Sequence, residues 1–172
     1  MISRRSLILT GLAGVMGGAA SAAPPAADPV AIVTAIYTRA AKGKGVGGGV
    51  FVIENKAAKA KYLSKSLIEL WTKADAHTPK DDVGPIDFDP VTNSQEPDVK
   101  SFKVVAEKME TDTALIVVTH TGHQATPRKP VDQVVRYAFV RDGDARKIDD
   151  ITGSSNGEPW SIRDMLAASL KN

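Results

Sequence analysis

Two adjacent carboxylates, Asp149 and Asp150, form the pair in this sequence best suited to acid–base chemistry. Neighbouring residues of a strand face opposite sides, so one of the two is expected to point into the interior. A carboxylate in an apolar cavity has a raised pKa and can act as a general base, with Tyr137 as hydrogen-bond donor to an oxyanion. Alternatively, the pair anchors a loop or pairs with Arg136 or Arg146, because structural ion pairs also perturb carboxylates.

A second group of polar residues lies in the proline-containing segment 78–98 and comprises Asp87, Asp89, Asn93 and Gln95. Their side chains offer the oxygen ligands that Ca²⁺ takes, but the spacing lacks the glycine and the bidentate glutamate of a calcium loop. Asp and Asn also commonly bond to local backbone in turns. Because long loops in compact domains are often functional, we expect these four residues to contact a ligand or a protein partner, without a metal.

His120 and His123 form a His-x-x-His pair in a chain that has no cysteine. Positions three apart on a strand point to opposite faces, and the third histidine, His77, is distant in the sequence. A zinc site needs three or four protein ligands. The pair therefore predicts a solvated strand end rather than a metal site.

Motifs of other catalytic classes are missing from the sequence. The glycine-rich segment 43–49 lacks the Gly-Lys-Ser/Thr ending of a phosphate-binding loop, and it follows a predicted helix, so it is expected to be a linker. There is no nucleophile elbow and no dinucleotide fingerprint, so no cofactor is expected. The larger aromatic residues have the spacing of core residues: Tyr37, Trp71, Phe139 and Trp160.

The first 22 residues have the three-part pattern of a secretory signal peptide: a charged start with Arg4 and Arg5, an apolar run, and Ala20-Ser21-Ala22. The paired arginines are typical of a twin-arginine signal, which carries folded proteins across the bacterial inner membrane. The apolar run is shorter than the about 20 residues of a membrane-spanning helix. We predict cleavage after Ala22 and a periplasmic protein that meets the membrane only during export, with the general secretory route as the alternative.

Removing the signal peptide changes the charge of the chain. The full sequence has 22 basic and 20 acidic residues, and residues 1–22 contain two arginines and no acid, so 23–172 is formally neutral. No basic stripe remains for binding nucleic acid. A short leader over 23–27 and one domain over 28–172 are expected, because about 150 residues can bury a core without disulfides.

Hydrophobic periodicity changes from helical to strand-like along the domain. Asp28, Asn55, Ser64 and Ser161 stand where helix N-caps are expected, the last before a C-terminal helix that ends near residue 170. Between the third and fourth caps, four strands joined by short turns are predicted over 102–107, 114–121, 133–141 and 145–152. The order indicates an α+β fold with N-terminal helices packed on a curved four-stranded antiparallel sheet.

Three motifs extend this prediction: Tyr62-Leu63-Ser64, Asp87-Phe88-Asp89-Pro90 with Asn93 and Gln95, and Lys147-Ile148-Asp149-Asp150-Ile151. With the order of elements, they resemble the nuclear-transport-factor-2-like (cystatin-like) superfamily, and more closely an exported bacterial family of unknown function. The resemblance spans most of residues 28–170. It implies a cone-shaped sheet with one open end, and some enzymes of the superfamily use an Asp and a Tyr there. The family often has Trp where this chain has Arg146.

These observations favour a non-enzymatic, exported binding module that takes a small ligand in the cone or a periplasmic protein on its surface. The alternative is a cofactor-free lyase or isomerase with Asp149 or Asp150 as base and Tyr137 as donor. A homodimer formed through the open sheet face is a third possibility. The resemblance itself implies no known reaction, because fold does not supply function.

Overall fold

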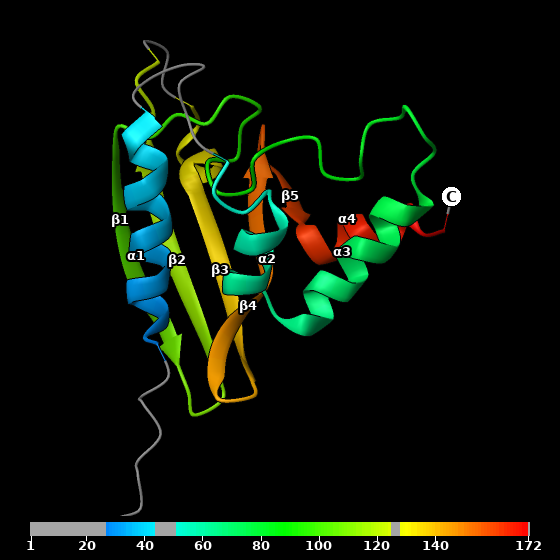
Figure 1. Ribbon diagram of the computed structural model, residues 1–172. Coiled ribbons are helices and arrows are strands. Elements are labelled where there is room, and N and C mark those ends of the chain that lie inside the picture. The colour runs from blue at the N-terminus through cyan, green and yellow to red at the C-terminus, as the bar shows by residue number, and fades with distance from the viewer. Residues whose placement is uncertain (1–26, 44–50, 125–127, 172) are drawn as a thin grey trace, which may run out of the picture.

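The computed structural model describes residues 27–43, 51–124 and 128–171 (Figure 1). The signal peptide with its cleavage site after Ala22, nearly all of the 23–27 leader and nearly all of the 43–49 linker lie outside these residues. None of the helices in the described ranges is long and apolar enough to cross a membrane.

The fold is α+β, as predicted, and its centre is an antiparallel sheet in which each strand pairs with the next along the chain. The prediction of four strands is wrong, because the sheet has five. They are β1 Ser101–Met109, β2 Thr113–Thr121, β3 Val134–Asp142, β4 Ala145–Ser155 and β5 Glu158–Ser161. The α-helices precede the sheet or follow it, so the five strands form a simple antiparallel meander (Figure 1).

The fifth strand comes from a hairpin at Asn156 and Gly157, between the predicted end of the fourth strand at residue 152 and the cap at Ser161. Both residues have positive φ, 55° and 94°. Ser155 pairs with Glu158 across the turn. An Asn-Gly pair is the usual sequence of a two-residue hairpin whose central residues are left-handed. Strand β4 therefore extends three residues beyond its predicted end and leads directly into β5.

Four α-helices begin where the sequence predicts their caps: α1 Pro29–Ala40, α2 Lys56–Tyr62, α3 Lys65–His77 and α4 Ile162–Ser169. In each case the side-chain oxygen of the preceding Asp, Asn or Ser accepts from a backbone N–H of the first turn. Such caps satisfy one of the unpaired donors at a helix start. Two 3₁₀ turns, Ala41–Gly43 and Pro130–Gln133, complete the regular structure of the described residues.

The core lies between the helices and one face of the sheet. Helix α1 packs on β1 and β2, whereas α3 and α4 pack on each other beside the β4–β5 end (Figure 1). Tyr37 and Phe139 are at most 1 % exposed, and Trp71 is buried too, as their spacing predicts. Trp160 is only half-buried, and it stacks edge-on against Phe88. The segment that carries Phe88 runs from α3 across the end of the sheet to β1 (Figure 1).

Candidate functional site

The two adjacent aspartates do not alternate between the sheet faces, because they lie in a β-bulge. Ala138 pairs with Asp150 and Phe139 pairs with Ile148, so Asp149 is the extra residue of β4. A bulge places two residues opposite one and breaks the two-residue period of a strand. The inward positions are Ile148 and Ile151, both fully buried. The expectation that one of the two acids points inward by alternation therefore does not hold at this bulge.

Asp149 and Asp150 instead fasten the starts of two helices. Asp149 accepts 2.6 Å hydrogen bonds from the Ser64 hydroxyl, the cap of α3, and from the Arg163 guanidinium. Asp150 accepts from the Ser161 hydroxyl, the cap of α4, at 2.7 Å and from the Arg163 backbone N–H at 3.1 Å. A carboxylate near helix N-termini is also favoured by the helix dipole. This geometry fits a structural anchoring role for the two aspartates better than the role of a general base.

The ion-pair partner predicted for these aspartates is wrong. Arg163 on α4 pairs with Asp149, whereas Arg136 lies 3.8 Å from Glu107. Arg146 donates to the backbone carbonyls of the β1–β2 turn. The helix that carries Arg163 is brought to the aspartates by the β5 hairpin, which explains why neighbouring strand residues were the wrong candidates.

Tyr137 is fully buried and uses its hydroxyl inside the core. It donates to the Tyr37 hydroxyl at 3.3 Å, and Tyr37 donates to the Val91 carbonyl at 2.5 Å. Burial raises the pKa of both tyrosines far above the ordinary range. Tyr137 therefore links β3, α1 and the 78–98 segment in one chain of hydrogen bonds, and its O–H already has a partner.

The four polar residues of the 87–95 segment divide into two buried and two exposed. Asp89 is 1 % exposed and accepts from the Thr92 hydroxyl at 2.8 Å and from the Val91 N–H at 3.1 Å, so it organises the local turn. Burial raises its pKa to about 6. Asn93 is also buried, whereas Asp87 and Gln95 are exposed.

Three of the four sequence-predicted binding residues nonetheless share one cavity, which Asp89 does not line. A pocket of about 420 Å³ is lined by Asp87, Asn93 and Gln95, together with residues that include Trp160. Asn93 accepts from the Trp160 indole N–H at 2.9 Å. That bond occupies the amide oxygen of Asn93, so the cavity offers a ligand mainly exposed side chains and an aromatic edge.

His120 occupies the most unusual position among the described residues, and the prediction of a solvated strand end is wrong for it. Its side chain is only 3 % exposed. Neither Nδ1 nor Nε2 has a hydrogen-bond partner in the part of the chain that the structure describes. Nearly all buried polar side-chain atoms in proteins are hydrogen-bonded, so a ring with two free nitrogens needs an explanation.

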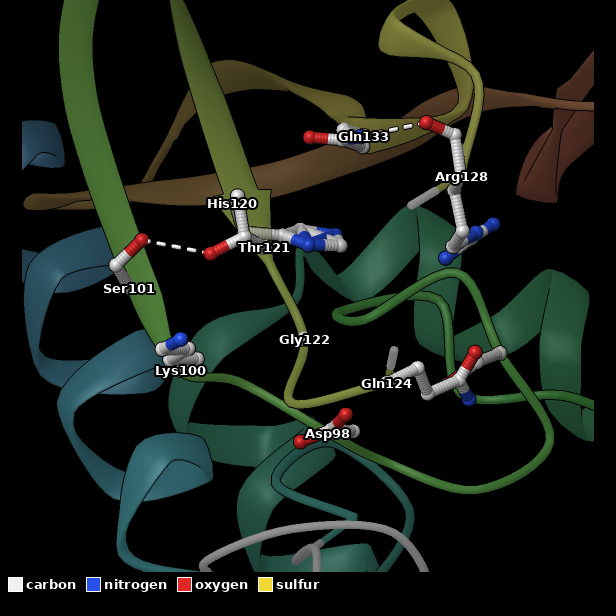
Figure 2. A pocket seen from close by; sticks show the side chains of 10 residues that line it. Asp98, Lys100, Ser101, His120, Thr121, Gly122, Gln124, Arg128 and Gln133 are labelled. Carbon is white, nitrogen blue, oxygen red and sulfur yellow. Dashed lines mark hydrogen bonds between the residues drawn. The ribbon is translucent and has the colours of Figure 1, made fainter. Parts of the chain in front are cut away.

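A pocket of about 390 Å³ opens beside this ring (Figure 2). Its lining includes Ser101 and Thr121 at the end of the β1–β2 pair, and Arg128 and Gln133 around the second 3₁₀ turn. Ser94 of the polar segment also contributes. In Figure 2 the His120 ring points from β2 toward the side of the pocket that holds Arg128. The pocket thus combines residues from four separate parts of the sequence.

Burial is the main reason that the ring is neutral. Burial, with the nearby Arg128 charge, lowers the pKa of His120 to about 4. A neutral imidazole has one N–H donor and one acceptor nitrogen. At neutral pH the ring therefore presents both kinds of hydrogen-bonding group to whatever enters the pocket.

His123, the second histidine of the pair, is held away from His120. Asp98 accepts from the His123 backbone N–H through Oδ2 and contacts Nδ1 through Oδ1, both at 2.6 Å. Burial acts to raise the pKa of Asp98, but the hydrogen bonds from His123 outweigh it and the pKa is lowered. Gly122 makes this contact possible, since a Cβ there would lie 2.5 Å from Asp98 Oδ2.

The sequence does contain a signal for the His120 site. On β2 the buried positions are Ala114, Ile116, Val118 and His120, which is an unbroken two-residue period. Extending that period by one step places His120 on the core face. Only the companion residues at 94, 128 and 133 come from parts of the chain that this pattern does not reach.

In comparisons with known proteins, no family model, no curated protein and no solved structure matches this chain. The functional argument therefore rests on the residues and geometry of the two pockets. Of these, the pocket beside His120 has the buried, unpaired polar group.

Proposed function

We propose that this chain is an exported, non-enzymatic binding module that takes a small ligand in the pocket beside His120. The observation that carries the proposal is the buried His120 ring at the wall of a pocket of about 390 Å³, where neither ring nitrogen has a partner among the described residues. Ligand sites in proteins are mostly concave, with a few convergent polar groups. We propose further that the fold is that of the nuclear-transport-factor-2-like superfamily, with this pocket at the open end of the cone.

The energetics favour a ligand at this position. A buried polar group without a hydrogen bond costs about 1–3 kcal/mol. A ligand that bonds to His120 recovers this cost, so the empty pocket is less stable than the filled one. Rigid strands and the Tyr37 ring, whose centroid is 5.8 Å from that of His120, hold the imidazole in place. The group is therefore preorganised for binding.

A lyase or isomerase with Asp149 or Asp150 as its base has less support. Each carboxylate accepts hydrogen bonds from a helix-capping serine and from Arg163. A base already bonded to several donors is a weaker proton acceptor. Neither aspartate lines the pocket beside His120.

Native mass spectrometry tests the proposal. Wild-type protein purified from cells should carry a reproducible small-molecule mass, and His120→Phe should lose it, because phenylalanine fills the site without donating or accepting hydrogen bonds. His77→Phe is the matched control: His77 is exposed at the end of α3, so this variant should keep the added mass. A bare wild-type chain, or a mass that survives His120→Phe, would contradict a ligand site at His120.

Export to the periplasm is a separate part of the proposal. Replacing Arg4 and Arg5 together by lysine keeps the charge but removes the arginine pair. Precursor should then accumulate in the cytoplasm, while wild-type protein reaches the periplasm, as fractionation and immunoblotting would show. If the double-lysine variant is exported and cleaved normally, the general secretory route carries the protein instead.

A further inference from the structure

We propose that the pocket beside His120 binds a small organic carboxylate, whose charged end is held by the Arg128 guanidinium and an N–H of His120. This inference rests on the proposed function, since it names the class of ligand for the same site. It is carried by three features of the pocket: its two cations, the Asp98 carboxylate already bonded to His123, and the donor that His120 provides.

The cations are placed at two sides of the pocket. Arg128 is half-buried and donates from Nη1 to the Thr92 carbonyl at 3.0 Å, which fixes its direction. A guanidinium has five N–H groups, so others can face a ligand. Lys100 lies on the opposite side, beyond Gly122 (Figure 2), and its side chain is exposed. Arg128 therefore provides a directed contact, and Lys100 adds attraction at the opening.

The acidic group of the pocket is already occupied. Both Asp98 oxygens contact His123, one through the backbone N–H and one through the ring. Asp98 is 7 % exposed, and in Figure 2 it lies beneath Gly122, away from Arg128. Among the lining residues, one committed acid stands against two cations. Asp132, the other acid that acts on Arg128, accepts hydrogen bonds from Ser154 and Gly157, so the lining itself favours an anion.

His120 adds a hydrogen bond that suits a carboxylate. Its neutral ring donates one N–H, and a carboxylate oxygen accepts that bond more strongly than a neutral oxygen does. The second oxygen remains for Arg128, which bonds carboxylates through parallel N–H groups. A volume of about 390 Å³ lies at the small end of ligand sites, so it suits a small organic acid, with room for a carbon skeleton.

The test compares matched acids and amides. Benzoate with benzamide, and propionate with propionamide, would be titrated into wild-type protein while the ¹⁵N resonances of the His120 ring are followed. At least one carboxylate should bind about tenfold more tightly than its amide, as expected for a hydrogen bond to a charged group. Arg128→Gln should abolish this preference, and Arg39→Gln, on the exposed side of α1, should leave it unchanged.

The outcomes separate the ligand class from the site itself. Equal binding of acid and amide would overturn the carboxylate and leave the pocket as a ligand site. A preference that survives Arg128→Gln in a variant with an unchanged backbone spectrum would overturn the role of Arg128 in holding the charged end. Inorganic phosphate binding as tightly as the carboxylates would overturn the organic ligand in favour of a free anion. If no probe moves the His120 resonances and the native mass is bare, both proposals fail.

Discussion

Replacing Asn93 by alanine is expected to lower the free energy of unfolding by about 3 kcal/mol, although the sequence presents Asn93 as a binding residue. Its amide nitrogen donates to the Asp132 carbonyl at 3.0 Å and to the Ser154 carbonyl at 2.5 Å. Its amide oxygen accepts from Trp160. All three bonds join the 78–98 segment to residues of the sheet and of the 3₁₀ turn before β3, and Phe88 adds its contact with Trp160.

The expected cost has two physical sources. Truncation leaves two buried carbonyls and an indole N–H without their partner, and each unsatisfied buried group costs about 1–3 kcal/mol, partly recovered where water enters. Asn93 also has a φ of 52°, in the left-handed region, which asparagine tolerates better than alanine. Both effects act in the same direction.

Urea unfolding followed by circular dichroism measures the loss. Asn93→Gly separates the two sources, because glycine adopts a positive φ freely but makes no side-chain bonds, so its loss should be smaller than that of alanine. Gln95→Ala is the matched control: Gln95 is exposed two residues away, and its change should stay within about 0.5 kcal/mol. An Asn93→Ala variant with wild-type stability but no retained ligand would instead support a direct binding role.

The same substitution should also weaken the pocket beside His120. Arg128 donates to the Thr92 carbonyl, next to Asn93, and Ser94 lines the pocket. Releasing the segment therefore removes one wall and the support of the guanidinium. The sequence predicts Asn93 as a binding residue, and its three hydrogen bonds also hold that segment in position.

Local sequence was sufficient for the helix starts and for two of the hairpins. Asp28 and Ser64 cap their helices because a cap depends only on the next three residues. The β3–β4 hairpin forms next to the Asp-Gly pair: Asp142 pairs with Ala145, so the two-residue loop is Gly143-Asp144, with a φ of 64° at Gly143. The β4–β5 hairpin is equally predictable from Asn156-Gly157. A prediction without this hairpin lacks one strand and cannot place Arg163 beside the two aspartates.

Other features depend on contacts between distant residues and could not be predicted from local patterns. The partners of Asn93 lie 39 and 61 residues further along the chain. The bulge at Asp149 is a property of how β4 pairs with β3, and a pattern of alternating residues within one strand does not contain it. For the same reason the polar wall of the pocket, from Arg128 and Ser94, appears only in the folded chain.

The second large effect concerns pH, because Asp89 and His120 are buried with pKa values shifted in opposite directions. Burial raises the pKa of Asp89 from 3.8 to about 6, against hydrogen bonds from Thr92 and Val91, with Glu54 adding to the rise. Burial and Arg128 lower the pKa of His120 from 6.5 to about 4, with Asp98 opposing. Both groups therefore titrate differently in the folded and unfolded chain over the same pH window.

The signs follow from proton linkage. Between pH 4 and 6 the folded chain binds more protons at Asp89 than the unfolded chain does, so this group makes stability fall as pH rises. At His120 the unfolded chain binds more protons between pH 4 and 6.5, so this group makes stability rise with pH. Each shift of somewhat over two pH units corresponds to about 3 kcal/mol, and the two nearly cancel.

Single substitutions should expose each half of this balance. The free energy of unfolding of the wild type should change by less than about 1 kcal/mol between pH 4 and 6.5. That of His120→Phe should fall by about 3 kcal/mol as pH rises over this range, and that of Asp89→Asn should rise by about as much. Urea midpoints at each pH provide the measurement, and the slope with pH is independent of any constant loss from the substitution. Asp98 and Asp132 have lowered pKa values, so their contribution is lost only below about pH 4. In the double variant His120→Phe/Asp89→Asn, the free energy of unfolding should again be nearly independent of pH. Two single variants with the wild-type profile would mean that neither buried group changes its protonation on folding, and the neutral His120 on which the ligand argument depends would lose its support.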